Sequence, residues 1–346
     1  MSLFHDAAED YAFCFGRISG MESKMFTDQA IVGLAQAGSL AEVLSNLEGS
    51  EFQREIKEAD FESISSIEET LNVHFFRIYD DLTSTIVTQD KEELDSLLAG
   101  ERDHFNLKLL LRGFQKGIGF EDLRDSFRFA GIVNFEFLES LASSTDLDEL
   151  LKGIESKTQL FGKRLGEVEL DQSQTENEAS LDLAMDYALA ESWVNKEFKN
   201  PALREYVNLR IDLINLLNML RCIVWGVDPK KYVISGGLII RTQRLLNSSP
   251  LELSVLKDEI KSSVLEPLLD GVETDDPETI DFAALEFKAE KIRTRFISEK
   301  SMVDPLTLYS LLQFFSKKEA EIKNIRTIVY AKYYDLPVEE ITKAMS

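Results

Sequence analysis

The chain has 346 residues, of which 44% are hydrophobic, and it carries a formal net charge of −24. This acidity disfavours binding to nucleic acid or directly to anionic lipid, because both require a basic protein surface. With 17 glycines and 7 prolines, the sequence has too few turn residues for a β architecture, and apolar residues recur at helical spacing along most of it. We therefore predict an all-α protein.

No stretch of the sequence predicts a signal peptide or a membrane span. Acidic residues occur within the first ten positions, where a signal peptide would be basic and then apolar. The longest uncharged run, 29–41, has 13 residues, whereas roughly 18 apolar residues are needed to cross a bilayer. The two cysteines are too few for a disulfide framework and are predicted to be buried thiols. We expect a cytoplasmic protein.

Three pairs of short helices are predicted by similar segments at 34–44, 141–151 and 246–256. In each segment two apolar stretches flank a turn of small or polar residues, which include Gly38, Ser39, Ser143, Ser144, Ser248 and Ser249. Two interpretations of these turns are open. Ser39 and Ser144 would cap the second helix of their pairs, or the six residues would line one rim where small side chains admit a partner helix.

Three long helices are predicted to carry an acid three residues before an asparagine. The pairs are Asp103 and Asn106, Asp212 and Asn215, and Glu321 and Asn324, and successive asparagines are 109 residues apart. A spacing of three places each acid and asparagine on one face of a helix. Six residues later stand Arg112, Arg221 and Tyr330, and the amphipathic helix before each long helix begins near Leu71, Leu181 or Leu285.

A repeat of about this length predicts domains rather than a solenoid. We expect unit boundaries at 1–105, 106–214 and 215–318, with 319–346 completing the first unit. The helix that contains Asn324 should then pack beside residues 11–52, and the three units should superpose by rotations of roughly 120°. The polar segments 171–180 and 270–281 are expected to be solvated connectors.

The sequence contains no convincing catalytic, cofactor or metal motif. It lacks the glycine-rich loop that holds nucleotide phosphates, and the Gly117-Ile118-Gly119 stretch lacks the third glycine of a dinucleotide-binding turn. Glu101 and His104 have the spacing found in di-iron carboxylate helices, but such a site needs a second copy and two further glutamates. We expect no catalytic, cofactor-binding or metal-binding residues, and a helical-bundle metalloenzyme stays an alternative.

Both ends of the chain resemble a known family. The N-terminal segments 11–27, with Arg17 and Glu22, and 37–52 resemble the start of the C subunit of V/A-type ATPases, which is called the d subunit in eukaryotic vacuolar enzymes. The C-terminal segments 321–328 and 336–341 resemble the end of the same protein. The repeats between them fit the same scheme.

This resemblance implies three similar helical domains around a pseudo-threefold axis, forming a funnel. It implies a non-catalytic rotor component that is monomeric when isolated and peripheral to the membrane. Its partners would be the central-stalk proteins and the membrane proteolipid (c/K) ring, so that it would couple the shaft to the ring during ion transport or ATP synthesis. A free-standing helical scaffold derived from the same unit is the alternative.

Overall fold

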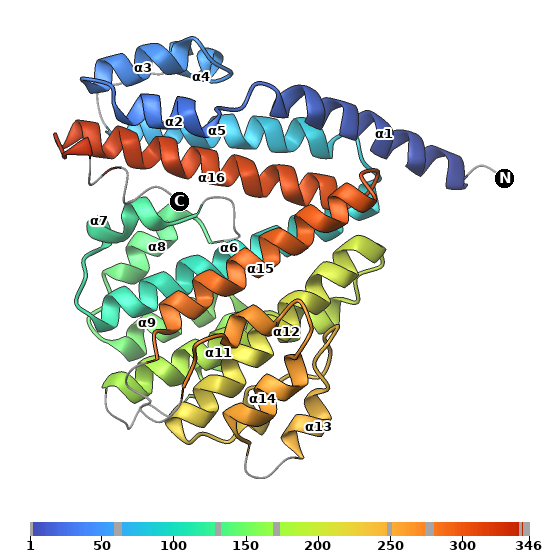
Figure 1. Cartoon of the computed structure of the whole chain (residues 1–346). Coiled ribbons are helices and arrows are strands. Elements are labelled where there is room, and N and C mark those ends of the chain that lie inside the picture. Colours follow the sequence, from blue (N-terminus) through green and yellow to red (C-terminus); the bar gives the residue numbers. More distant parts are fainter. Residues whose placement is uncertain are drawn as a thin grey trace. The chain divides into compact units, whose positions relative to one another are not determined.

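The computed structural model describes residues 3–58, 64–128, 133–168, 174–247, 251–273, 280–338 and 341. Within these ranges every regular element is a helix (Figure 1), which confirms the predicted all-α class. Contacts divide the chain into two compact units. Unit 1 combines residues 1–91 with 297–346, and unit 2 comprises 92–296. The expected division into three domains stays a prediction.

Unit 1 is built from segments at opposite ends of the chain. Its helices are α1 (Leu3–Glu22), α2 (Asp28–Ala35), α3 (Leu40–Glu48), α4 (Gln53–Glu58), α5 (Ile64–Thr83) and α16 (Leu308–Tyr333). Helix α16 packs against α1, α2, α3 and α5 (Figure 1). In the core the ring centroids of Tyr79 and Phe315 are 4.9 Å apart. The expected packing of the Asn324 helix beside residues 11–52 is thus confirmed.

The remaining helices lie wholly or mostly in unit 2. They are α6 (Thr88–Gln115), α7 (Phe120–Leu123), η1 (Arg124–Ser126), α8 (Phe135–Ala142), α9 (Leu147–Lys157), α10 (Gln159–Leu165), α11 (Gln174–Lys196), α12 (Pro201–Trp225), η2 (Pro229–Lys231), α13 (Thr242–Leu246), α14 (Leu253–Ile260), η3 (Glu266–Leu269) and α15 (Phe282–Val303). Helix α11 packs between α10 and α12. The chain crosses from one unit to the other within α6 and again within α15.

The three long helices that carry the repeat end in the same way. Gly117, Gly226 and Asp335 each lie 11 residues after the asparagine, and their φ angles are 67°, 66° and 53°. The next residue donates its N–H to a carbonyl five residues earlier, at 2.9, 3.0 and 2.8 Å respectively. This left-handed ending satisfies carbonyl groups that the last turn of a helix leaves free. The repeat seen in the sequence is therefore a repeat of local structure.

The expectation that the segment 171–180 is a connector is wrong for its second half. Helix α11 begins at Gln174, so residues 174–180 form its first turns, while 171–173 lie outside the described residues. Gln, Glu and Ala are favourable helix formers, so the polarity of this stretch does not prevent it from being helical. In the other expected connector, residues 270–273 and 280–281 are not helical.

Candidate functional site

Asn215 binds both backbone groups of one distant residue. Its Oδ1 accepts the N–H of Ile234 at 3.0 Å, and its Nδ2 donates to the carbonyl of Ile234 at 2.9 Å. The side chain is fully buried. An amide is suited to this position because it offers an acceptor and a donor side by side, whereas a carboxylate would place an oxygen against the carbonyl of Ile234.

Asp212, one turn earlier on α12, binds the next stretch of the same loop. Its carboxylate accepts the backbone N–H groups of Leu238 and Ile239, both at 2.7 Å, and of Ile240 at 3.1 Å. Gly237 has a φ of 108°, and a Cβ atom at this position would lie 2.0 Å from Oδ1 of Asp212. Only glycine fits here, because the backbone must both turn and let the carboxylate approach.

The same arrangement occurs on α6. Asn106 binds both backbone groups of Arg128, at 2.7 Å for the N–H and 2.6 Å for the carbonyl. Asp103 accepts the N–H of Val133 at 2.9 Å. Both side chains are buried. They reach from the helix to a loop 22 to 30 residues ahead, well beyond the local hydrogen bond that a spacing of three allows.

The third acid, Glu321, makes the equivalent bond between α16 and a residue near the N-terminus. Glu321 on α16 accepts the N–H of Phe26 at 2.6 Å and also binds Lys318 at 2.6 Å. Phe26 immediately precedes Thr27, the N-cap of α2. In the other copies Val133 precedes Asn134, the N-cap of α8, and Ile240 precedes Arg241, the N-cap of α13. We call Asp103/Asn106, Asp212/Asn215 and Glu321 the clamps.

Each clamp therefore binds the residue that leads into a short-helix pair. The pairs are α2 with α3, α8 with α9, and α13 with α14. One end of each pair is tied by hydrogen bonds to a long helix of the same unit. The Asp and Asn side chains in unit 2 have almost no solvent exposure, so these hydrogen bonds form where no water can replace them.

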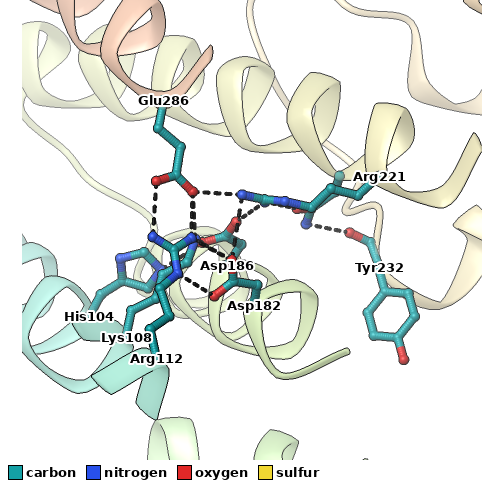
Figure 2. A network of polar contacts seen from close by, with 9 residues as sticks. His104, Lys108, Arg112, Asp182, Asp186, Arg221, Tyr232 and Glu286 are labelled. Atoms are coloured by element: carbon teal, nitrogen blue, oxygen red, sulfur yellow. Dashed lines mark hydrogen bonds and ion pairs between the residues drawn. The ribbon is translucent and has the colours of Figure 1, made fainter. Parts of the chain in front are cut away.

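A second polar feature of unit 2 joins four helices (Figure 2). Lys108 and Arg112 from α6, Asp182 and Asp186 from α11, Arg221 from α12 and Glu286 from α15 form a charged network with equal numbers of positive and negative groups. The amino group of Lys108 lies 2.8 Å from Asp186 and 3.2 Å from Glu286. Arg221, which is fully buried, lies 2.6 Å from Glu286.

The cations of this network lower the pKa values of carboxyl groups within it. Burial alone would raise the pKa of Asp186, but Lys108 and Arg221 hold it well below its usual range. Burial would also raise the pKa of Glu286, but the same cations together with Arg112 lower it to about 2. Asp186 and Glu286 therefore stay ionised at neutral pH, and each ion of the network has partners of opposite charge, as a buried ion requires.

Glu101 and His104, the two residues of the di-iron spacing, have different partners. Glu101 accepts hydrogen bonds from the hydroxyl of Tyr206 and from Nε of Arg210, both at 2.9 Å. His104 lies 2.8 Å from Asp186, and burial lowers its pKa. Among the described residues there is no group of three or more His, Cys, Asp or Glu side chains arranged to hold a metal ion.

Two of the three predicted turns lie in the described residues. Gly38 and Ser39 connect α2 to α3, and Ser39 caps α3 by accepting the N–H of Glu42 at 3.2 Å. Ser143 and Ser144 connect α8 to α9, but Asp146 caps α9, so the expected capping role of Ser144 is wrong. Asp146 takes the role because it stands directly before the first helical residue. Ser248 and Ser249 lie outside the described residues.

The turns share a further pattern that the repeat in the sequence does not reveal. Glu42 accepts the N–H of Gly38 at 2.7 Å, and Glu149 accepts the N–H of Thr145 at 2.7 Å. Each glutamate stands three residues after its capping residue, as in a capping box, and here it binds the residue before the cap. Gly38, Ser39 and Ser143 are exposed to solvent. Whether the turns form a common rim stays a prediction.

No helix in the described part of the chain is both long and apolar enough to cross a membrane. Comparison with known proteins gives the family. The model of the ATP synthase (C/AC39) subunit family matches residues 15–344.

The chain belongs to the ATP synthase (C/AC39) subunit family.

Its relatives in this family match over most of their length. The C subunit of the A-type ATP synthase of Methanocaldococcus jannaschii is 26% identical, covering 96% of this chain and 85% of the relative. The corresponding protein of Haloferax volcanii is 26% identical and covers 95% of both chains. The C subunit of the V-type ATP synthase of Deinococcus radiodurans is 23% identical, covering 97% of this chain and 91% of the relative.

Proposed function

We propose that this chain is the C subunit of an A-type or V-type ATP synthase and that it has no catalytic role. The observation that carries the proposal is the family match over residues 15–344, together with relatives named as the C subunit of an A-type or a V-type ATP synthase. In this role the chain connects the central stalk to the membrane proteolipid ring. It transmits rotation during ion transport or ATP synthesis.

The buried polar groups support a mechanical role. The clamps fasten loops to long helices, and the charged network fastens α6, α11, α12 and α15 to one another. A protein that transmits torque must resist deformation, and closely packed helices joined by buried polar contacts deform little. The side chains that would otherwise suggest chemistry, among them Glu101 and His104, are engaged in such contacts.

The surface charge suggests the chemistry of the partners. A net charge of −24 favours association with basic surfaces. In the proposed complex these surfaces belong to loops of the proteolipid ring or to the central stalk. The chain would then be a cytoplasmic, peripheral component that is monomeric when isolated.

Co-purification from the native host tests this proposal. The tagged chain is isolated from detergent-solubilised membranes, and we expect the ATPase head and proteolipid proteins to accompany it. Deleting its gene should abolish ATP-driven ion transport by membrane vesicles, while ATP hydrolysis by the detached head continues. Recovery of the chain without ATPase components, with transport unaffected by the deletion, would instead support a free-standing helical scaffold.

A further inference from the structure

We propose that the clamps are positioning residues that make each short-helix pair move as one body with its long helix, and that this rigidity keeps rotation coupled to ion transport. The coupling part of this inference rests on the proposed function. The clamp residues need not touch any partner, because they act on the position of the short helices.

The first support is the identity of the bound residue. In all three copies the acid accepts the N–H of the residue directly before the N-cap of the first short helix, namely Phe26, Val133 or Ile240. A hydrogen bond that only satisfied one backbone N–H of the loop would not have to recur at the same position in all three copies. Its recurrence places the attachment where the direction of the short helix is set.

The second support is the number of bonds in the clamp on α12. Asn215 and Asp212 together make five hydrogen bonds to the segment 234–240. Two bonds to Ile234 fix its orientation as well as its distance from α12. Removing either side chain leaves buried backbone groups without a partner, which is unfavourable, so the loop is held tightly in one arrangement.

The third support is the absence of a side chain at position 237. Gly237 adopts a φ that side chains rarely allow, and any Cβ there would collide with Asp212. Because position 237 has no side chain, the carboxylate of Asp212 can reach three successive N–H groups. The clamp can therefore be disrupted from either of its two sides, by changing the acid or by changing the glycine.

The test uses variants on both sides of one clamp. Asp212→Asn replaces a carboxylate oxygen with an NH₂ group that cannot accept the loop N–H groups, and Gly237→Ala introduces the collision. In the isolated chain we expect amide hydrogen exchange at 234 and 238–240 to accelerate at least tenfold in both variants. If exchange stays at the rate of the unchanged chain in both variants, the clamp itself is refuted.

The coupling readout uses the complete ATPase in vesicles. We expect both variants to assemble and hydrolyse ATP at the normal rate, while ions transported per ATP fall at least twofold. Asn200→Ala serves as the matched control, because it removes the cap of α12, which accepts the N–H groups of Ala202 and Leu203, and leaves the clamp intact. This control should lower thermal stability by a similar amount without changing the transport ratio.

Two results would overturn the coupling role. One is a normal number of ions transported per ATP in the two clamp variants despite faster amide exchange. The other is an equal fall of this ratio in Asn200→Ala, which would show that the ratio follows general stability. If a variant does not fold, Asn106→Asp, which places a carboxylate oxygen against the carbonyl of Arg128, replaces it, and amide exchange is then followed at 128 while the transport ratio is measured as before. Failure of the proposed function differs from failure of the coupling role, because in the former case even the unchanged chain would not join or affect an ATPase.

Discussion

Asp335 occupies a backbone conformation that the other two copies give to glycine. Its φ is 53°, and Gly117 and Gly226 stand at the equivalent positions. An L side chain in this region is less stable than glycine by roughly 1 kcal/mol, and somewhat less for Asp, which tolerates the left-handed region. The third copy thus ends its helix with the same geometry at a higher free energy.

Replacing Asp335 with glycine should therefore stabilise the chain. We expect the free energy of unfolding to rise by about 0.5 to 1 kcal/mol for Asp335→Gly and to fall by about 1 kcal/mol for Gly226→Ala. Urea denaturation of the purified chain, followed by circular dichroism, measures both. No difference between Asp335→Gly and the unchanged chain would show that the left-handed cap carries no strain.

Arg221 is the most enclosed cation of the charged network. Its removal would leave Asp186 and Glu286 with fewer partners in a buried site. We expect Arg221→Met to lower the free energy of unfolding by about 3 to 5 kcal/mol. The matched control is Arg164→Met, because Arg164 pairs with Glu191 and Glu167 nearer the surface and should lose less than about 1 kcal/mol. Equal effects in the two variants would contradict the importance of burial.

His74 is expected to make unit 1 sensitive to acid. Burial lowers its pKa to about 4, with a further contribution from Lys318, although Glu55 opposes this shift. Glu55 and Arg77 lie against Nδ1 of the ring, and Phe52 stacks on it at 3.9 Å between centroids. Lys318 lies over the other partner of this stack, the ring of Phe52. The unfolded chain binds the proton near pH 6.5, so stability is lost as pH falls from about 6.5 towards about 4.

His74→Gln removes this titration and provides the comparison. Between pH 7 and pH 5 the unchanged chain should lose up to about 2 kcal/mol more stability than the variant, from the pKa difference. Thermal or urea unfolding at each pH gives the two curves. Parallel curves would mean that His74 does not contribute, and the remaining slope in the variant reports the carboxylates.

At the scale of elements, the short-helix turns have two roles that can be separated. We expect Gly38→Trp and Ser143→Trp to weaken stalk binding without changing thermal unfolding, because neither position is a capping residue that binds the N–H groups of the next helix. Asp146→Ala, which removes the cap of α9, should instead lower thermal stability, with a loss of about 1 kcal/mol. If both tryptophan variants bind the stalk normally, the turns act only in helix capping.

The elements also show what the sequence could predict. The helical period and the spacing of Asn106, Asn215 and Asn324 were sufficient for the class, for the long helices and for the packing of α16 beside the N-terminal segment. The partners of the clamps were not predictable, because a buried amide gives no sign of which backbone groups it binds.

The charged network was missed for a similar reason. Its contacts join residues separated by 35 to 178 positions, and helical periodicity describes only local neighbours. A signal was nevertheless present. Asp182 and Asp186 lie one turn apart in an otherwise apolar stretch of α11, opposite Lys108 and Arg112, which are also one turn apart on α6. Paired charges in apolar helices indicate partners on another helix.

At the scale of the whole molecule, the net charge of −24 has a measurable consequence. If the acidic surface meets basic loops, binding to the proteolipid ring or stalk should weaken as salt rises above about 0.1 M, where charges more than about 10 Å apart are already screened. We expect the dissociation constant to increase at least tenfold between about 0.05 and 0.5 M salt in a binding titration. Binding unaffected by salt would assign the acidity to solubility.

The two-ended construction of unit 1 determines when it can fold during synthesis. Helices α1 and α5 are translated before unit 2, yet their packing partner α16 is translated only after all of unit 2. Until then the apolar faces of α1 and α5 have no α16 to cover them, and exposed apolar surface of this kind promotes aggregation. Unit 2, which is continuous in sequence, can complete its fold on the nascent chain. The N-terminal helices are therefore the part of this protein that most needs a chaperone.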